Sequence, residues 1–144
     1  MPVAEDMAAL VQLPQTAGVA KGDVVRVTGP NGLRAMYWLN RLGYRNAAYV
    51  HPRRVATMQP VDALLVPHPC SAQELDGLIH GGACVREGGV LIVQTTAAGA
   101  LEGGDTVTAL LLRRDFRVEA RLAQGGCHFC VARRQAFSAF TKVA

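Results

Sequence analysis

Hydrophobic runs and amphipathic stretches alternate along most of this chain. Four short apolar runs, at residues 24–28, 47–51, 62–66 and 90–95, have the length and composition of buried strands. Apolar residues at helical spacing separate several of these runs. Near the C-terminus, charged and apolar residues alternate on both sides of a Gln-Gly-Gly turn, as in a hairpin. This order predicts an α/β fold: a three-layer sandwich with a mostly parallel sheet and a C-terminal antiparallel hairpin.

Residues typical of helix ends lie at the boundaries of the amphipathic stretches. Asn31 is placed to cap a helix that Gly43 would end. Ser71 and Glu74 have the spacing of a capping box, and Asp105 is placed to cap a third helix. The predicted helices lie at 33–42, from 71 onward and at 106–114, and the hairpin strands lie at 117–123 and 127–134.

Prolines and glycines interrupt the pattern at three places. Residues 5–20 are helical in pattern, with predicted breaks at Pro14 and Gly18. Residues 52–60 carry a proline at both ends, which leaves no room for a long helix. Residues 87–89 predict a turn before the fourth strand. The segment 52–60 bears on function, because it is all that joins the second strand to the third.

The composition fits a single domain over residues 1–144, with a helical lead-in at 1–21 and a tail at 135–144. Half of the residues are hydrophobic, and the formal net charge of +4 suits an anionic ligand as well as it suits solubility. No secretion signal is visible, and the apolar runs are far too short to span a bilayer. Four cysteines in such a chain predict reduced thiols and a cytoplasmic location.

The turn after the first strand is a candidate ligand site. In the sequence VVRVTGPNGLR at 24–34, Gly29, Asn31 and Gly32 can present backbone N–H groups to an anion or a cofactor. A dinucleotide site is disfavoured, because the three-glycine fingerprint is missing and no acid follows the second strand. The simpler interpretation is a tight turn that needs glycine for positive φ and asparagine as a cap.

A second candidate is Pro67-His68-Pro69-Cys70, which ends the predicted third strand. Ligands bind at the carboxyl ends of strands in open α/β sheets, so Pro67 and His68 are candidate contacts. His68 is the best candidate for a general base. His51 ends the second strand, so two imidazoles are expected to face one crevice. Cys70 would act as a nucleophile only with a lowered pKa, and the alternative is a rigid, proline-framed turn.

Cys127 and Cys130 have the spacing of a metal or redox motif. In a strand, however, residues three apart point to opposite faces, so the two sulfurs cannot share an ion. A four-cysteine zinc site that also used Cys70 and Cys84 would lack a second closely spaced pair. We therefore expect no metal, and we expect these cysteines to act as small buried hydrophobes.

The basic and aromatic residues give little support for nucleic-acid binding. Arginine pairs at 53–54, 113–114 and 133–134 are spread along the chain, without an aromatic stacking motif. Phe137 and Phe140 in the tail would indicate a partner surface if they were exposed, but we expect them to pack back onto the domain. A homodimer or a protein partner is therefore an open expectation, and nucleic acid and membrane partners are not expected.

The order of the parts resembles the class I S-adenosylmethionine-dependent methyltransferase fold. GDVVRVTGPNG stands where that family has its first strand and glycine-rich loop. LDGLIHGGACVREGGVLIV is similar to the family's helix, Pro-Gly-Gly turn and fifth strand, with Glu87 in place of the proline. LLLRRDFRVEARLAQGGCHFCVARR is similar to its last helix, Gly-Phe step and closing hairpin, with Asp115-Phe116 in place of Gly-Phe. The resemblance covers most of residues 22–134 and implies a small Rossmann-like domain.

The departures from the family pattern concern the cofactor. Arg26, Thr28 and Pro30 stand where the family has an acid and two glycines. His51 stands where the family has the acid that binds the ribose hydroxyls. The nine residues 52–60 replace a helix, a strand and a loop, so the resemblance implies a trimmed sheet.

These departures favour a divergent, methyltransferase-like protein that is non-catalytic and acts in binding or oligomer formation, with no cofactor expected. One alternative is an active S-adenosylmethionine-dependent methyltransferase with an atypical cofactor loop. Another is a nucleotide-binding module that uses the same crevice. The residues expected to line the crevice are Gly29, Asn31, Gly32, His51, Pro67 and His68. An open crevice would favour the alternatives, and a crevice filled by side chains would favour the non-catalytic protein.

Overall fold

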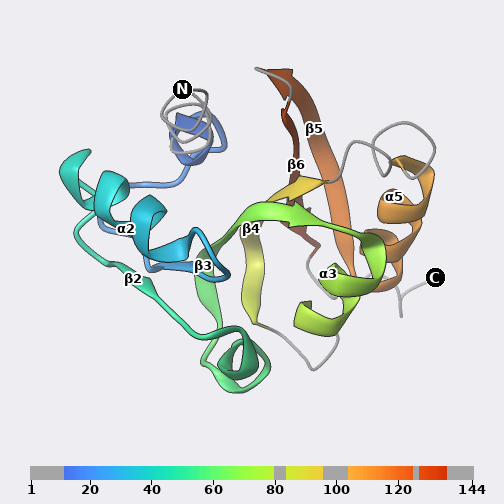
Figure 1. Ribbon diagram of the computed structural model, residues 1–144, viewed down its shortest axis with the longest axis horizontal. Coiled ribbons are helices and arrows are strands. Elements are labelled where there is room, and N and C mark those ends of the chain that lie inside the picture. The colour runs from blue at the N-terminus through green and yellow to red at the C-terminus, as the bar shows by residue number, and fades with distance from the viewer. Residues whose placement is uncertain (1–11, 80–83, 96–103, 125–126, 136–144) are drawn as a thin grey trace, which may run out of the picture.

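The computed structural model describes residues 12–79, 84–95, 104–124 and 127–135. These residues form one six-stranded sheet with the strand order β2-β1-β3-β4-β6-β5 (Figure 1). The strands are β1 (Val25–Val27), β2 (Ala47–Tyr49), β3 (Val61–Cys70), β4 (Val85–Thr95), β5 (Phe116–Gln124) and β6 (Cys127–Arg134). The first four are parallel to one another, and the β5–β6 hairpin joins β4 in antiparallel fashion. The predicted sheet is therefore confirmed.

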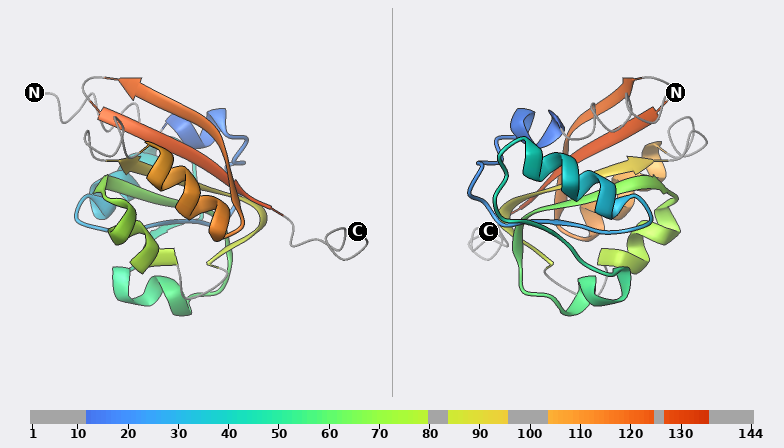
Figure 2. Two further views of the ribbon diagram at one scale, coloured as in Figure 1. Left: turned by 90° about the vertical axis from the view of Figure 1, so that its right-hand side faces the viewer. Right: turned by 60° about the vertical axis from the view of Figure 1, so that its left-hand side comes forward.

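Helices cover both faces of the sheet, which gives the predicted three layers (Figure 2). The helix α2 (Gly32–Arg41) lies on one face, and α3 (Ala72–Ile79) and α5 (Gly104–Arg113) lie on the other. A short 3₁₀ helix, η1 (Pro52–Thr57), packs beside α3. None of the helices in the described residues is long and apolar enough to cross a bilayer.

The central strands β3 and β4 are buried on both faces, because consecutive side chains point into different layers. In β3, Leu64 packs into the cluster beneath α3 and α5, whereas Leu65 packs into the cluster beneath α2. Their partners in β4, Leu91 and Ile92, divide in the same way. Burial of each such side chain stabilises the fold by about 1.5–3 kcal/mol, so these two strands anchor the molecule.

The connection between β2 and β3 is as short as the sequence predicts. Residues 50–60 are all described, and they contain η1 but no strand. His51 precedes η1, and its Nδ1 accepts a hydrogen bond from the Arg53 backbone N–H at 3.1 Å. As a result β2 forms the edge of the sheet, and the trimmed sheet is confirmed.

Two strands are longer than predicted. β3 continues through Pro67 to Cys70, whereas the predicted strand ends at Val66. The ladder to β4 shifts register between Val66 and Pro69, and this irregularity accommodates prolines that lack an N–H. The turn predicted at 87–89 is instead part of β4, in an irregular stretch where residues 86–89 lie opposite only Asp62 of β3 and Gly88 has φ +82°.

The helix ends agree with the sequence only in part. The capping box is confirmed, since Ser71 N donates to a Glu74 carboxylate oxygen at 3.0 Å and Glu74 N donates to Ser71 Oγ at 3.2 Å. The break predicted at Pro14 is wrong, because residues 12–16 are helical. Asp105 lies inside α5 instead of capping it. The predicted features at 80–83, 97–103 and 136–144, with Phe137 and Phe140, lie outside the described residues.

Candidate functional site

The carboxyl ends of β1 and β3 lie side by side, and the chain turns from β1 into α2 directly beyond them. Thr28 N donates to Leu65 O at 3.1 Å, which fixes the end of β1 to β3. Gly32 N donates to Gly29 O at 2.9 Å and closes a tight turn. Gly29 has φ +96°, a conformation that glycine adopts without strain. The turn predicted from the sequence is therefore formed, and it needs a glycine at position 29.

His68 fills the space over Gly29. A Cβ built on Gly29 would lie 2.3 Å from His68 Nδ1 and 2.4 Å from His68 Cε1. Real atoms do not approach so closely, so the imidazole already occupies the position that a side chain at residue 29 would take. A ligand that approached this glycine closely would need the same space.

Tyr49 covers the second glycine of the turn in the same way. A Cβ on Gly32 would lie 2.7 Å from both Cδ1 and Cε1 of the Tyr49 ring. Tyr49 is not among the site residues predicted from the sequence. The available signal was strand alternation, because Tyr49 lies two residues after Ala47 and so shares the α2 side of β2 with it.

Asn31 bonds to β3 and does not cap α2, which corrects the prediction. Its side-chain Nδ2 donates to Pro67 O at 3.0 Å, and its side chain makes no capping hydrogen bond. This bond joins the turn to the end of β3. Asn31 and Pro67, which the sequence marked as ligand contacts, are thus bonded to each other.

The His68 imidazole is held neutral by its surroundings. Burial lowers its pKa, although the Glu74 carboxylate opposes this shift more weakly. Its Nε2 lies 3.3 Å from Cys70 Sγ. A neutral imidazole is the form that a general base requires, so the chemistry predicted for His68 is available in principle.

Cys70 cannot act as a nucleophile at neutral pH. The residue is only 1% exposed, and burial, followed by the nearby Glu74 carboxylate, raises the pKa of the thiol to about 12. The thiolate is the reactive form. The sequence left this possibility open for a thiol with a lowered pKa, and the shift runs in the opposite direction.

Two buried polar atoms at the ends of the adjacent strands have no hydrogen-bond partner within the described part of the chain. They are Thr28 Oγ1 and His68 Nδ1. A buried polar atom left unpaired costs about 1–3 kcal/mol, so a water molecule or a ligand atom would be favoured beside either of them. Both atoms are inaccessible to solvent in this arrangement.

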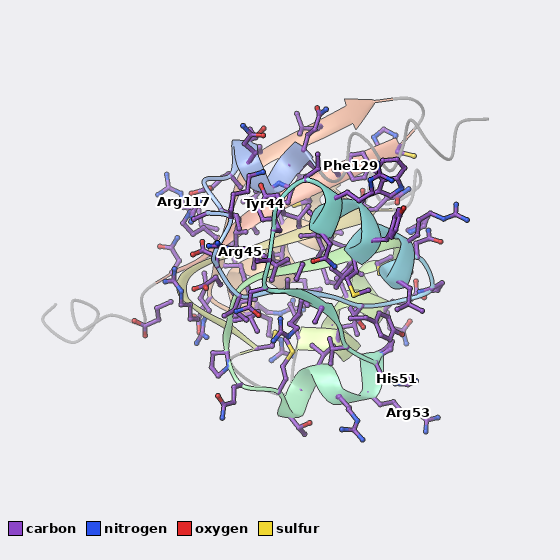
Figure 3. The ribbon with its side chains drawn as sticks, turned by 90° about the vertical axis from the view of Figure 1, so that its left-hand side faces the viewer. Tyr44, Arg45, His51, Arg53, Arg117 and Phe129 are labelled. Carbon is purple, nitrogen blue, oxygen red and sulfur yellow. The ribbon has the colours of Figure 1, made fainter. Side chains whose placement is uncertain are left out.

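His51 and Arg26 are engaged elsewhere. His51 is exposed and bonds to Arg53 at the start of η1, where both residues project from the periphery of the molecule (Figure 3). Strand β1 separates β2, which precedes His51, from β3, which carries His68. The Arg26 guanidinium donates to Val25 O and Asn46 O, both at 2.9 Å, and so turns back toward the amino ends of β1 and β2.

The two cysteines of β6 lie on opposite sides of the sheet, as the strand geometry predicts. Cys130 is buried in the cluster beneath α3 and α5, whereas Cys127 packs against the cluster beneath α2. Across the parts of the chain that the structure describes, no three or more histidine, cysteine or acidic side chains are grouped to hold a metal ion.

Solved structures of methyltransferases share this architecture at low sequence identity. The ribosomal protein L11 methylase from Lactobacillus delbrueckii subsp. bulgaricus matches 90% of this chain and 79% of its own, with a TM-score of 0.69 and 13% identity. A putative RNA methyltransferase from Pyrococcus horikoshii matches 92% and 83%, with a TM-score of 0.71 and 13% identity. The release-factor-specific protein-(glutamine-N5) methyltransferase from Alicyclobacillus acidocaldarius matches 94% of both chains, with a TM-score of 0.55 and 14% identity.

No protein-family model and no curated protein sequence matches this chain. The structural likeness therefore concerns the fold. The chain has the class I S-adenosylmethionine-dependent methyltransferase fold in a divergent form whose sheet is trimmed after β2.

Proposed function

We propose that this chain is a non-catalytic methyltransferase-like protein that acts by binding a partner. The observation that carries the proposal is the packing of the His68 ring over Gly29, where a Cβ would lie 2.3 Å from His68 Nδ1. A cofactor loop must leave its glycine backbone open to the cofactor. Here the protein's own imidazole fills that space, so the glycine serves the packing of the fold.

The groups around the turn also fit S-adenosylmethionine poorly. Arg26 places a cation where the family has an acid, and its side chain turns toward Asn46. Pro30 has no N–H to donate. His51 uses Nδ1 to accept a bond from Arg53, which leaves no carboxylate-like pair of acceptors for two ribose hydroxyls. The residues present therefore do not fit the cofactor, and we derive no methyl-transfer step.

One observation favours an active methyltransferase with an atypical loop. The unpaired Thr28 Oγ1 and His68 Nδ1 lie at the strand ends where a ligand would bind. If the His68 ring rotated away from Gly29, these atoms would gain access to a ligand. This second candidate therefore requires a movement of His68, and the same experiment tests both candidates.

Calorimetric titration of the full chain with S-adenosylmethionine and S-adenosylhomocysteine tests the proposal. We expect no binding, or binding in the millimolar range. Loss of each charged hydrogen-bonding partner costs about 1.5–3 kcal/mol, and two such losses weaken a micromolar site to roughly millimolar or worse. ATP in a parallel titration tests the nucleotide-binding alternative.

Two variants distinguish two possible reasons for an absence of binding: a crevice blocked by side chains, and a crevice without the groups that bind the cofactor. His68→Gly removes the ring over Gly29, and Tyr49→Ala removes the ring over Gly32. We expect neither variant to bind either ligand, because Arg26, Thr28 and Pro30 still stand where the family has an acid and two glycines. A low-micromolar dissociation constant for the unmodified chain would refute the non-catalytic role. If only His68→Gly bound S-adenosylmethionine or S-adenosylhomocysteine, the His68 ring alone would be what blocks the crevice.

A further inference from the structure

The outer surface of α2 is unusually apolar for a solvent-facing helix. Six large hydrophobic side chains in the described residues are exposed, and four of them belong to α2 or to the residue after it. They are Leu33 (61% exposed), Tyr37 (53%), Trp38 (39%) and Leu42 (44%). Exposed hydrophobic side chains gathered on one helix mark an interaction site more often than singly scattered residues do.

The charges on this surface are all positive. α2 carries Arg34 and Arg41 and no acidic residue. The Arg41 guanidinium lies 5.7 Å from the centroid of the Tyr37 ring and 5.8 Å from that of Trp38, and it donates to Tyr37 Oη at 3.0 Å. Cation–π contacts of this kind hold the charge within the apolar surface. We call the exposed side chains of α2 and Leu42 the α2 face.

A hollow of about 350 Å³ lies at the C-terminal end of the α2 face. Its lining residues are Gln12, Gln15, Thr16, Lys21, Trp38, Leu42 and Tyr44. Lys21 Nζ donates to Leu42 O at 2.9 Å and lies 4.1 Å from the centroid of the Tyr44 ring. An ammonium has three N–H donors, so Lys21 can still donate a hydrogen bond to a bound ligand. No acidic residue is among the lining residues.

We propose that the α2 face and this hollow bind an acidic amphipathic segment of a partner protein. An apolar side chain of the segment would enter the hollow against Trp38 and Leu42, and its carboxylates would pair with Lys21, Arg34 and Arg41. Helices that place an apolar face in a groove and acids around it are a recurring mode of recognition. This inference deepens the proposed binding role, but it concerns a surface separate from the crevice, so each can fail without the other.

The charges and shape of the α2 face disfavour other occupants. A symmetric dimer through α2 would place Arg34 and Arg41 against the same cations of the second copy, which is repulsive. Membrane recognition typically uses clusters of four to eight basic residues, whereas α2 carries two arginines, one of them held over the aromatic rings. A single-stranded nucleic acid needs open ring faces, and Arg41 lies over both Tyr37 and Trp38.

Trp38 makes the proposal directly measurable, because it is the only tryptophan of the chain. The probes are synthetic peptides of about 16–18 residues, long enough to form helices. Leucine or phenylalanine occupies one face and glutamate the other, and in a matched set every glutamate is replaced by lysine. We expect the acidic peptides to shift Trp38 emission to shorter wavelength in a saturable manner, and the lysine peptides to leave it unchanged.

Charge-reversal variants test whether the α2 face is the site. Arg34→Glu combined with Arg41→Glu should weaken binding by about tenfold or more, since several exposed charge pairs become repulsive. Arg53→Glu combined with Arg54→Glu is the matched control on η1 and should bind as the unmodified chain does. Unchanged unfolding midpoints would show that both variants fold.

Several outcomes would overturn the proposal. They are the absence of an emission shift with every acidic peptide, equal binding of the lysine peptides, equal loss of binding in the Arg53/Arg54 control, and a shift of Trp38 only with anionic phospholipid vesicles or an oligonucleotide. A Trp38 shift that depends on protein concentration without any peptide would indicate a second copy as the occupant and would likewise overturn it.

Discussion

Gly29 is the single residue on which the turn after β1 depends most. Gly29→Ala places a Cβ at 2.3 Å from His68 Nδ1 and requires alanine to adopt φ +96°. We expect this variant to lose about 2–4 kcal/mol of unfolding free energy, because strain and a steric clash add. Urea denaturation measures the loss.

Gly77→Ala is the matched control for this prediction. Gly77 lies in α3, and a Cβ there would meet nothing within 4 Å. Alanine should therefore stabilise the protein by about 0.5–1 kcal/mol, the usual difference between the two residues in a helix. If Gly29→Ala changed the unfolding free energy no more than Gly77→Ala does, His68 would not pack closely on the turn.

The lowered pKa of His68 predicts a pH dependence of stability. As the pH falls through 6.5, the unfolded chain binds a proton at His68 while the folded chain does not, so the unfolding free energy decreases. The decrease is at most about 1.4 kcal/mol per pH unit and ends below the folded-state pKa. His68→Gln should remove this part of the dependence, as urea denaturation at about pH 7.5 and about pH 5 would show. An identical slope in both proteins would contradict the prediction.

Among the secondary-structure elements, α3 has the clearest local signal. Ser71→Ala removes the Oγ that accepts from Glu74 N at 3.2 Å, and it should cost about 1 kcal/mol. Glu74→Gln keeps an oxygen that can accept from Ser71 N and should cost less. Chemical denaturation of both variants checks the order, and a larger loss in Glu74→Gln would contradict the capping box as the cause.

Hydrophobic runs and alternating residues along the chain predicted most of the strands and helices. Buried runs such as 62–66 and 90–95 appear as β3 and β4, and the hairpin at the C-terminus is formed. The errors occur where tertiary pairing overrides residue preference. β3 passes through Pro67 because its register to β4 shifts there, and the glycines at 88–89 lie within a strand because a bulge accommodates them.

The sequence predicts where the candidate site lies, but it does not predict whether side chains fill it. The order of strands and the Gly29 turn placed it at the carboxyl ends of β1 and β3. Whether the crevice is filled depends on the side-chain conformations of His68 and Tyr49, which approach Gly29 and Gly32 from distant parts of the sequence. Spacing along the chain carries no signal for such contacts. The α2 face was not predictable for a related reason, since helical spacing alone does not distinguish exposed apolar residues from buried ones.

For the molecule as a whole, the fold depends on different residues from those that would bind a cofactor. The sheet order and three layers depend on the alternating burial of β3, β4 and β6, which this chain retains. The family resemblance assigns cofactor binding to a few positions at one end of the sheet, where this chain has Arg26, Thr28, Pro30 and His51. Asp115, which stands at the position of the family's Gly-Phe step, adopts the left-handed conformation with φ +68°. Under the proposed function, this architecture is kept without the reaction.

The buried cysteines allow the opening of the core to be timed by thiol alkylation. Cys70, Cys84 and Cys130 belong to one cluster and are at most 3% exposed. Burial raises the pKa of Cys70 to about 12 and that of Cys130 to about 11, so these two thiols carry almost no thiolate near pH 8 in the folded protein. Alkylation must then wait for unfolding.

We expect these three thiols to react with iodoacetamide at one common rate, because they share a cooperative unit. The half-buried Cys127 should react first. Mass spectrometry of the labelled peptides over time gives each rate. Faster reaction of Cys84 than of Cys70 and Cys130 would mean that the start of β4 opens as a separate unit, ahead of the rest of the sheet.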